Sequence, residues 1–345
     1  MIRLAVDALN LRADERGMGR YVRGVLRTFA ARDDIALTLL VRDPDNAARY
    51  RAIAGDRAAV AATNTARRRG RYDAVWYPWN AMRFSVNARS LATVNDDFAF
   101  AYPARGLVAR LREQRPIVRA VRRATRVATI SEWSRGRLAA RFRIDPGRIA
   151  VLPLQPAAFF CPAAERAPFR EPFVLAVGGP ERRKNMAFFA DAFARAFPAR
   201  DVRLAIAGEL EPPARHTLQR TGVRFTQFPA CGDELLRRLY RTAAVVAVPS
   251  LDEGFGLVAV EAQACGAPVV ASNTSALPEA VDGAGALVAP DDRSGWISAL
   301  RRIVHDRELN GRLRAQGAAR WSGTARDATA SALLALLHRL VDERA

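Results

Sequence analysis

The chain has 345 residues, of which 50% are apolar and 26% charged, a composition that excludes a disordered protein and leaves room for two domains with cores of their own. Cys161, Cys231 and Cys265 lie far apart without a CxxC spacing and predict reduced thiols, not a disulfide framework or a zinc site. The net charge is +19, and residues 1–160 carry +16 of it, which favours an anionic partner such as nucleic acid, a membrane surface or a phosphorylated substrate.

The N-terminal segment does not resemble a targeting signal. Asp7 follows the first apolar residues too early for a signal peptide, and no apolar run approaches the roughly 18 residues that span a bilayer. We therefore expect a cytoplasmic protein, either soluble or peripheral on the inner face of the cell membrane.

Short apolar runs separated by helical stretches predict twelve strands in two sets of six. In the first half they are residues 2–6, 35–41, 74–77, 91–94, 127–130 and 149–152. In the second half they are residues 173–177, 204–207, 223–226, 245–248, 269–271 and 286–288. Because strand and helix alternate, the sequence predicts an α/β protein with two doubly wound, Rossmann-like domains built on parallel sheets.

Five prolines between positions 153 and 172 interrupt regular structure between the two halves. We expect an N-terminal domain at residues 1–155, a linker at 156–171 and a C-terminal domain at 172–325. The Ala- and Leu-rich stretch 326–341 predicts a last helix, within residues 326–345, that packs back on the first domain. Since open α/β sheets bind ligands at the carboxyl ends of their strands, we expect the site in a cleft shared by both sheets.

The most informative motif runs from Val248 to Gly266. A strand ends at Val248, and a glycine-containing loop then opens a helix whose first N–H groups, near Gly256 and Leu257, can hold an anion. Gly266 supplies the C-terminal stop of that helix.

Two glutamates hold fixed places in this motif. Glu253 lies on the loop, and Glu261 lies more than one turn inside the helix. A carboxylate near a nucleotide can accept hydrogen bonds from ribose hydroxyls, and one on the loop can accept them from a sugar. Alternatively, Glu261 is a solvated helix residue and Glu253 a charge placed favourably near the helix dipole.

A second motif is basic. Gly178 and Gly179 end a strand, and Arg183 and Lys184 then begin a helix with Asn185. Two fixed cations at this point would stabilise a leaving diphosphate. The alternative is a solvated basic helix start, although Lys184 is the only lysine among 54 basic residues.

Together these motifs resemble the E-x7-E signature of family 4 glycosyltransferases, which are retaining enzymes of the GT-B fold. The resemblance covers nearly the whole chain and rests on four stretches: GMGRY at 17–21, VATISEWS at 127–134, VGGPERRKN at 177–185 and the segment 248–269. It implies that Glu253 contacts the donor sugar, Glu261 the nucleotide ribose, and Arg183 with Lys184 the diphosphate. We add the glycines and neighbours of these turns to the donor-binding set: Gly17, Gly19, Gly178, Gly254, Phe255, Gly256 and Leu257.

The first domain departs from the family at one position. Residues 93–97 occupy the place of the family's histidine and aspartate, and Asn95 replaces the histidine. We expect Asn95 to donate a hydrogen bond to the donor sugar and Asp96 to contact the acceptor hydroxyl. In the front-face mechanism usually proposed for retaining enzymes, the leaving phosphate oxygen takes the acceptor proton, so no dedicated base is required. The loop with Gly17 and Gly19 would close its amides on the diphosphate or the acceptor.

No metal or other cofactor is expected. Asp43-Pro44-Asp45 imitates the DxD metal motif of the other glycosyltransferase fold, but it follows the second strand, far from the donor-binding half. The cationic pair Arg183 and Lys184 would supply the charge stabilisation that a metal gives elsewhere.

The sequence thus predicts a retaining, metal-independent glycosyltransferase that moves a hexose from a nucleotide diphosphate sugar to a saccharide or lipid-linked acceptor in surface polysaccharide synthesis. Mannose from GDP-mannose is the first donor to test. The alternatives are a nucleotide-sugar epimerase of the same fold and a nucleic-acid-binding protein. Because the chain has no aromatic-interleaved RNA motif and no zinc-finger spacing, we expect no nucleic acid partner.

Residues 105–126 predict a membrane contact. They hold eight arginines and one acid, and Pro116 predicts two short helices or one kinked helix. Apolar residues at helical spacing beside arginines suit an anionic lipid surface. A helix that buries the same face against its own sheet is the alternative. The apolar residues concerned are Leu107, Val108, Leu111, Ile117, Val118 and Val121.

Overall fold

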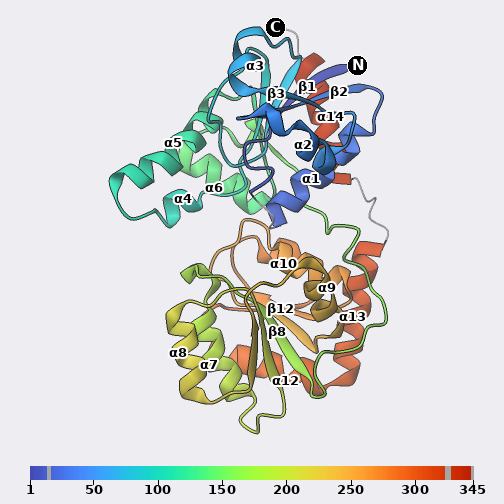
Figure 1. Cartoon of the computed structure of the whole chain (residues 1–345). Coiled ribbons are helices and arrows are strands. Elements are labelled where there is room, and N and C mark those ends of the chain that lie inside the picture. The colour runs from blue at the N-terminus through green and yellow to red at the C-terminus, as the bar shows by residue number, and fades with distance from the viewer. Residues whose placement is uncertain (14–16, 323–327, 343–345) are drawn as a thin grey trace. The chain divides into compact units, whose positions relative to one another are not determined.

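The computed structural model describes residues 1–13, 17–322 and 328–342 (Figure 1). The chain divides into two compact units, one made of Met1–Gln155 with Arg326–Ala345 and the other of Pro156–Ala325. Each unit is built on one parallel β-sheet with helices packed against it. The chain is therefore an α/β protein with two doubly wound units.

The first unit has a seven-stranded sheet in the order β3-β2-β1-β4-β5-β6-β7. All its neighbouring strands run parallel. The strands are β1 (Ile2–Asp7), β2 (Ile35–Val41), β3 (Ala59–Ala62), β4 (Ala74–Tyr77), β5 (Arg89–Thr93), β6 (Arg126–Thr129) and β7 (Ile149–Val151). The strand order reverses at β1 and β4, so the carboxyl ends of these central strands mark the usual ligand edge of such a sheet.

Helices cover both faces of this sheet. One face packs against α1 and α14 through Leu4, Val22 and Leu337, and the other packs against α5 and α6 through Ile117 and Leu138. The helices are α1 (Gly17–Ala30), α2 (Ala47–Ala54), α3 (Thr63–Arg69), α4 (Phe98–Ala101), α5 (Leu107–Arg123), α6 (Glu132–Phe142) and α14 (Ala328–Asp342), with 3-10 turns η1 (Pro44–Asn46) and η2 (Pro146–Arg148).

The last helix, α14, belongs to the first unit. It lies beside α1 (Figure 1), where Leu333 and Leu337 are fully buried. The Thr329 hydroxyl donates a hydrogen bond of 2.9 Å to the carbonyl of Pro153. Of the helix expected at 326–341, the first two residues lie outside the described ranges.

The second unit has a six-stranded parallel sheet in the order β10-β9-β8-β11-β12-β13. Its strands are β8 (Phe173–Val177), β9 (Arg203–Ala207), β10 (Phe225–Phe228), β11 (Val245–Val248), β12 (Val269–Ser272) and β13 (Ala286–Val288). The helices are α7 (Met186–Ala196), α8 (Pro212–Thr221), α9 (Asp233–Thr242), α10 (Leu257–Ala264), α11 (Leu277–Val281), α12 (Arg293–His305) and α13 (Arg307–Ser322), with a 3-10 turn η3 (Arg182–Lys184). Here the order reverses between β8 and β11, which are hydrogen-bonded neighbours.

The prediction of six strands in the first half was wrong by one strand. The missed strand, β3, reads AVAA and pairs with Thr38–Val41 of β2 at the edge of the sheet. An edge strand of small, partly exposed residues lacks the apolar run that marks a strand buried on both faces. The strand expected at 223–226 is also displaced, because the pairing partners of β9 are Phe225–Phe228.

Of the two forms expected for residues 105–126, two short helices or one kinked helix, the structure excludes the first, because α5 runs from Leu107 to Arg123 with Pro116 inside it. Proline removes only its own N–H from the helical ladder. The turns that follow are held by the burial of Ile117, Ala120 and Val121 in the core of the first unit.

The proline-rich segment between the sheets packs on the second unit. Residues 152–172, all of them described, form no helix or strand. The Phe160 ring meets the Tyr240 ring edge-on at 5.8 Å, and the Arg241 Nε donates a hydrogen bond of 2.8 Å to the carbonyl of Cys161. These contacts assign the segment from Pro156 onward to the second unit.

Across the described ranges, none of the helices combines the length and the apolar character that a bilayer crossing requires.

Candidate functional site

The candidate site of the second unit lies at the carboxyl ends of β8 and β11. The turn after β8 leads into η3, which carries Arg183 and Lys184. The loop after β11 runs to the start of α10 and carries Glu253. Because β8 and β11 are neighbours where the strand order reverses, the two segments meet, and Leu251 donates its N–H to the carbonyl of Arg183 at 2.7 Å.

Three of the predicted site residues form one ionic cluster there. Lys184 Nζ lies 2.7 Å from Glu253 Oε1, and Arg183 Nη1 lies 3.2 Å from Glu253 Oε2. The Ser250 hydroxyl donates a further hydrogen bond of 2.8 Å to Glu253 Oε1. The three ionic side chains are only 13–17% exposed. Partial burial strengthens their attraction relative to a surface ion pair.

The pKa of Glu253 is lowered from its ordinary value. Burial acts to raise this pKa, but the charges of Lys184 and Arg183 and the hydrogen bonds from Lys184 and Ser250 together outweigh it. Glu253 is therefore ionised at neutral pH, which fits a carboxylate that accepts hydrogen bonds and stabilises positive charge rather than a proton donor.

The backbone around Glu253 is held by a residue that sequence reasoning missed. The Ser275 hydroxyl accepts the N–H of Glu253 at 3.0 Å, and the N–H of Ala276 donates to the carbonyl of Glu253 at 3.3 Å. Ser275 lies just after β12 with a positive φ of 55°. Its sequence neighbourhood carries no motif, so only the fold reveals its place.

The start of α10 requires glycine. Gly256 precedes the helix with φ +96°, and a Cβ at this position would lie 2.9 Å from Leu277 Cδ2 and 3.0 Å from Ala280 Cβ. The first turn of a helix leaves N–H groups without partners inside the helix, so the turn can bind an anion. Gly254 and Leu257 are half-buried here, and Phe255 is buried.

Glu261 lies inside α10, and it is not a solvated helix residue. The residue is only 3% exposed. The Tyr240 hydroxyl donates a hydrogen bond of 3.3 Å to Glu261 Oε2. A buried carboxylate needs hydrogen-bond donors to offset its desolvation. Tyr240 supplies one of them, and sequence reasoning did not identify this residue.

The glycine turn after β8 is set by backbone packing. Gly178 donates its N–H to the carbonyl of Ala207 at 2.8 Å, and a Cβ at Gly178 would lie 2.8 Å from the carbonyl oxygen of Glu209. The expectation that residues 183–185 begin a helix needs correction. Asn185 takes a left-handed conformation that separates η3 from α7, and its Nδ2 donates to the carbonyl of Pro290 at 3.0 Å.

In the first unit, Gly17 and Gly19 do not form the loop that was predicted. Both lie in the first turn of α1, which begins at Gly17. Helical φ and ψ values need no glycine, so these residues do not act by bending a loop around a ligand. The first-turn N–H groups of α1 are the feature that could face an anion.

The structure brings the start of α1 and Asn95 together. Asn95 is 2% exposed, and its Nδ2 lies 3.3 Å from the Met18 sulfur. The Asn95 N–H donates to Asn80 Oδ1 at 2.6 Å, and the Ser134 hydroxyl donates to the Asn95 carbonyl at 2.7 Å. Asn95 Oδ1 is buried without a hydrogen-bond partner among the described residues. A buried amide oxygen of this kind is available to a ligand that brings a donor.

The two aspartates after Asn95 differ. Asp96 is half-buried, and its Oδ1 accepts the N–H of Phe98 at 3.1 Å. Asp97, which was not among the predicted site residues, is 3% exposed at its side chain and pairs with Arg137 at 2.6 Å and with Arg141. Asp97 therefore fastens this segment to α6, whereas Asp96 remains the residue that could meet an acceptor.

The structure gives the Asp43-Pro44-Asp45 sequence a local role. Asp43 Oδ1 accepts the N–H of Asp45 at 3.0 Å and caps η1. Within residues 1–13, 17–322 and 328–342, no group of three or more His, Cys, Asp or Glu side chains is placed to hold a metal ion.

Comparison with known proteins agrees with this architecture. Residues 171–306 match the profile of the family described as glycosyl transferases group 1. The C-terminal part of the chain is therefore similar to the group 1 glycosyl transferases. The matched range includes η3, the loop with Glu253 and helix α10, so all three members of the ionic cluster lie in the segment that matches the family profile.

Two curated relatives carry related names. The chain is 38% identical over 176 residues to the D-inositol 3-phosphate glycosyltransferase of Corynebacterium jeikeium, a match that covers 44% of the chain and 42% of the relative. It is 34% identical over 221 residues to the MMP alpha-(1->4)-mannosyltransferase of Mycolicibacterium hassiacum, covering 60% and 53%. The chain thus matches about half the length of these relatives.

Solved structures show the same fold over the whole chain. The sucrose-phosphate synthase of Thermosynechococcus elongatus superimposes with a TM-score of 0.76 at 22% identity and covers 100% of both chains. The Anabaena protein HepE, determined in complex with UDP and glucose, gives a TM-score of 0.75 at 15% identity and covers 98% of this chain and 100% of its own. The two doubly wound units therefore form the GT-B fold that the sequence predicted.

Proposed function

We propose that this protein is a retaining, metal-independent glycosyltransferase that moves a hexose from a nucleotide diphosphate sugar to a saccharide or lipid-linked acceptor. The observation that carries the proposal is the cluster of Arg183, Lys184 and Glu253 at the carboxyl ends of β8 and β11. It combines two cations suited to a diphosphate with an ionised carboxylate suited to a sugar, within the segment that matches the family profile.

The cations have the right chemistry for a leaving diphosphate. An ammonium has three N–H donors, and the hydrogen bond to Glu253 uses one donor of Lys184. Glu253 holds Lys184 and Arg183 in place before the donor arrives, so the protein reorganises little when negative charge develops on the phosphate oxygen. This preorganised charge performs the task for which other enzymes use a divalent metal.

The reaction follows from these roles. The bond between the anomeric carbon and the β-phosphate oxygen breaks as the acceptor oxygen bonds to the same face of the sugar. The acceptor proton passes to the departing phosphate oxygen, and Arg183 with Lys184 stabilises the nucleoside diphosphate that leaves. Glu253 accepts hydrogen bonds from the sugar hydroxyls and stabilises positive charge at the anomeric carbon. Glu261 accepts hydrogen bonds from the ribose hydroxyls, and Asn95 and Asp96 contact the sugar and the acceptor, respectively.

GDP-mannose is the donor that we propose first. The mannosyltransferase among the curated relatives supports a mannosyl donor, whereas the HepE complex with UDP and glucose makes UDP-sugars the principal competitor. A screen of donor hydrolysis with UDP-, GDP- and ADP-sugars tests the proposal without a known acceptor. Release of nucleoside diphosphate from one class is expected, and its absence for all three classes would contradict a nucleotide-sugar donor.

Stereochemistry and metal dependence test the rest of the mechanism. The product is expected to keep the anomeric configuration of the donor, as measured by NMR of the transferred sugar. EDTA is expected to leave turnover unchanged. An inverted product would contradict the retaining mechanism. A requirement for added manganese would contradict the proposal that Arg183 and Lys184 stabilise the leaving diphosphate without a metal ion.

For the acceptor we propose a lipid-linked saccharide at an anionic cytoplasmic leaflet. Residues 1–160 carry a net charge of +16, which attracts anionic lipid. The first turn of α5 exposes Leu107 (72%) and Val108 (81%) beside Arg105 and Arg110. We limit the proposed membrane contact to this end of the helix, because Ile117 and Val121 are buried in the core of the first unit.

A further inference from the structure

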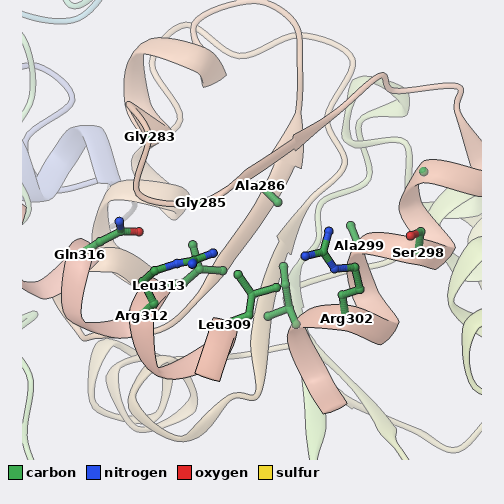
Figure 2. A pocket seen from close by; sticks show the side chains of 12 residues that line it. Gly283, Gly285, Ala286, Ser298, Ala299, Arg302, Leu309, Arg312, Leu313 and Gln316 are labelled. Carbon is green, nitrogen blue, oxygen red and sulfur yellow. The ribbon is translucent and has the colours of Figure 1, made fainter. Parts of the chain in front are cut away.

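The second unit contains a hollow that shares no residue with the ionic cluster. It has a volume of about 610 Å³ and lies between α12, α13 and the turn that precedes the edge strand β13 (Figure 2). This volume falls within the range of about 300–1,000 Å³ that small-molecule sites occupy. β13 is separated from β11 by β12 in the sheet, so the hollow and the Glu253 loop belong to different strands.

The walls of the hollow are firmly held. Ile303 and Leu313, which line it, are 1% and 6% exposed and belong to the core of the unit. The turn before β13 is fastened by Gln263 of α10, a fully buried residue whose Nε2 donates to the carbonyls of Val281 and Ala284 at 3.0 and 3.1 Å. The hollow therefore exists before any ligand arrives, and binding in it costs little ordering of the protein.

The lining combines an apolar floor with two arginines. Ala286, Ala299, Ile303 and Leu313 supply apolar surface. Arg302 from α12 and Arg312 from α13 enter from opposite sides, and Figure 2 shows their guanidinium groups pointing toward each other across the space below Ala286.

Within the described ranges, these two arginines have no carboxylate partner, unlike Arg320 of the same unit. Among the described residues, no carboxylate lies within 4.0 Å of Arg302 or Arg312. By contrast, Arg320 of the same helix α13 lies 3.5 Å from Asp282. Two like charges that face one another in a recess repel, and an anion placed between them relieves that repulsion.

We propose that this hollow binds a small organic phosphate, a molecule with a phosphate monoester on an apolar or flat body. The planar guanidinium forks of Arg302 and Arg312 suit the phosphate oxygens, which they can bind in a bidentate manner. The floor formed by Ala286, Ala299 and Leu313 accepts the apolar body. The Ser298 and Gln316 side chains at the lining add polar groups for its remaining oxygens.

Isothermal titration calorimetry of the full chain with phenyl phosphate tests this site. Phenyl phosphate is expected to bind at least about tenfold more tightly than inorganic phosphate or phenol, because only the combined ligand uses both the cations and the floor. Arg302→Gln and Arg312→Gln are each expected to weaken binding by at least about tenfold, the loss of one charge-assisted contact. Both residues are exposed, so the variants should keep the wild-type unfolding temperature.

Two control variants separate this site from others. Arg307→Gln removes an exposed arginine from α13 that does not line the hollow, and it should bind phenyl phosphate like the wild type. Lys184→Ala removes a cation of the ionic cluster and should also retain binding. Binding lost in Lys184→Ala but kept in Arg302→Gln and Arg312→Gln would overturn the proposal, and so would equal affinity for phenyl phosphate and inorganic phosphate or no binding at millimolar concentration.

Discussion

Lys184 Nζ lies 2.7 Å from Glu253 Oε1, although the two residues are 69 positions apart in the chain. The contact exists because each residue follows one of two neighbouring strands, β8 and β11, at their carboxyl ends. Arg183 completes the cluster on the other carboxylate oxygen. The proposed chemistry of the protein therefore depends on a meeting of two segments that no local sequence pattern encodes.

Replacing Glu253 by glutamine should lower kcat by at least about a hundredfold, because a contact made to developing charge is removed. The amide preserves the shape of the side chain but not its charge. Steady-state kinetics with the donor identified by the hydrolysis screen measures the effect. Glu234→Gln, which removes an exposed carboxylate paired with Arg237 on the surface of α9, serves as the matched control. Wild-type turnover by Glu253→Gln would contradict the assignment of Glu253 to the active site.

Lys184→Ala should also lower kcat by about a hundredfold, since a preorganised cation no longer faces the leaving diphosphate. Lys184→Arg should recover only part of this loss, because a guanidinium fork does not fit the place of a compact ammonium. The neighbouring exposed residue Arg182 supplies the control as Arg182→Ala. If Arg182→Ala lowers kcat as much as Lys184→Ala does, the reaction depends on general positive charge and not on the geometry of the cluster.

The strands were predictable because both sheets are parallel and buried on both faces. The runs at β4, β8 and β11 are continuous apolar segments, and the structure has them at the predicted residues. A strand that is buried on both faces must be apolar along its whole length, so an uninterrupted apolar run in the sequence is enough to locate it. The edge strand β3 escaped detection because alanines at an exposed edge carry a weak signal.

The site was predictable to the extent that motifs follow strands. Arg183, Lys184 and Glu253 were selected from two motifs, and the fold brings them into contact. Ser275 was not predictable, because its role as acceptor of the Glu253 N–H depends on the path of the chain after β12. Likewise, the pairing of Asp97 with Arg137 requires the three-dimensional position of α6.

Glu261→Gln should raise KM for the donor more than it lowers kcat. A ribose contact is made equally in the ground state and in the transition state, so its loss weakens binding without slowing the chemical step. Because Tyr240 donates to the Glu261 carboxylate at 3.3 Å, the glutamine oxygen can keep that bond and preserve the fold. Circular dichroism and thermal unfolding check this. A fall in kcat with unchanged KM would contradict the ribose role.

Asp7 gives the first unit a pH dependence that can be measured directly. Burial raises the pKa of Asp7 to about 6 from its ordinary value of 3.8, and the residue is 2% exposed. Between these two values the folded state binds a proton that the unfolded state has lost, so stability decreases as the pH rises from about 4 to about 6 and stays at the lower level above that.

The variant Asp7→Asn removes this titration and keeps an oxygen for the N–H of Leu9, which Asp7 accepts at 3.0 Å. At pH 7 it should be more stable than the wild type by up to about 3 kcal/mol, and the difference should vanish near pH 4. Urea unfolding at the two pH values measures it. Asp45→Asn, at an exposed turn, is the control. A variant that is less stable than the wild type at pH 7 would refute the argument.

Attachment of the first unit to a membrane should depend on the first turn of α5. Leu107 and Val108 are 72% and 81% exposed, and an apolar side chain that leaves water for a lipid interface gains free energy in proportion to the area buried. The double change of Leu107→Ser with Val108→Ser should therefore reduce vesicle flotation on anionic lipid. Binding of the wild type should weaken as salt rises, because the +16 charge of residues 1–160 is screened. Leu287→Ser, which alters a 38% exposed apolar residue of the second unit, should float like the wild type. Equal flotation with neutral vesicles, or none with anionic ones, would show that α5 does not dock on an anionic surface.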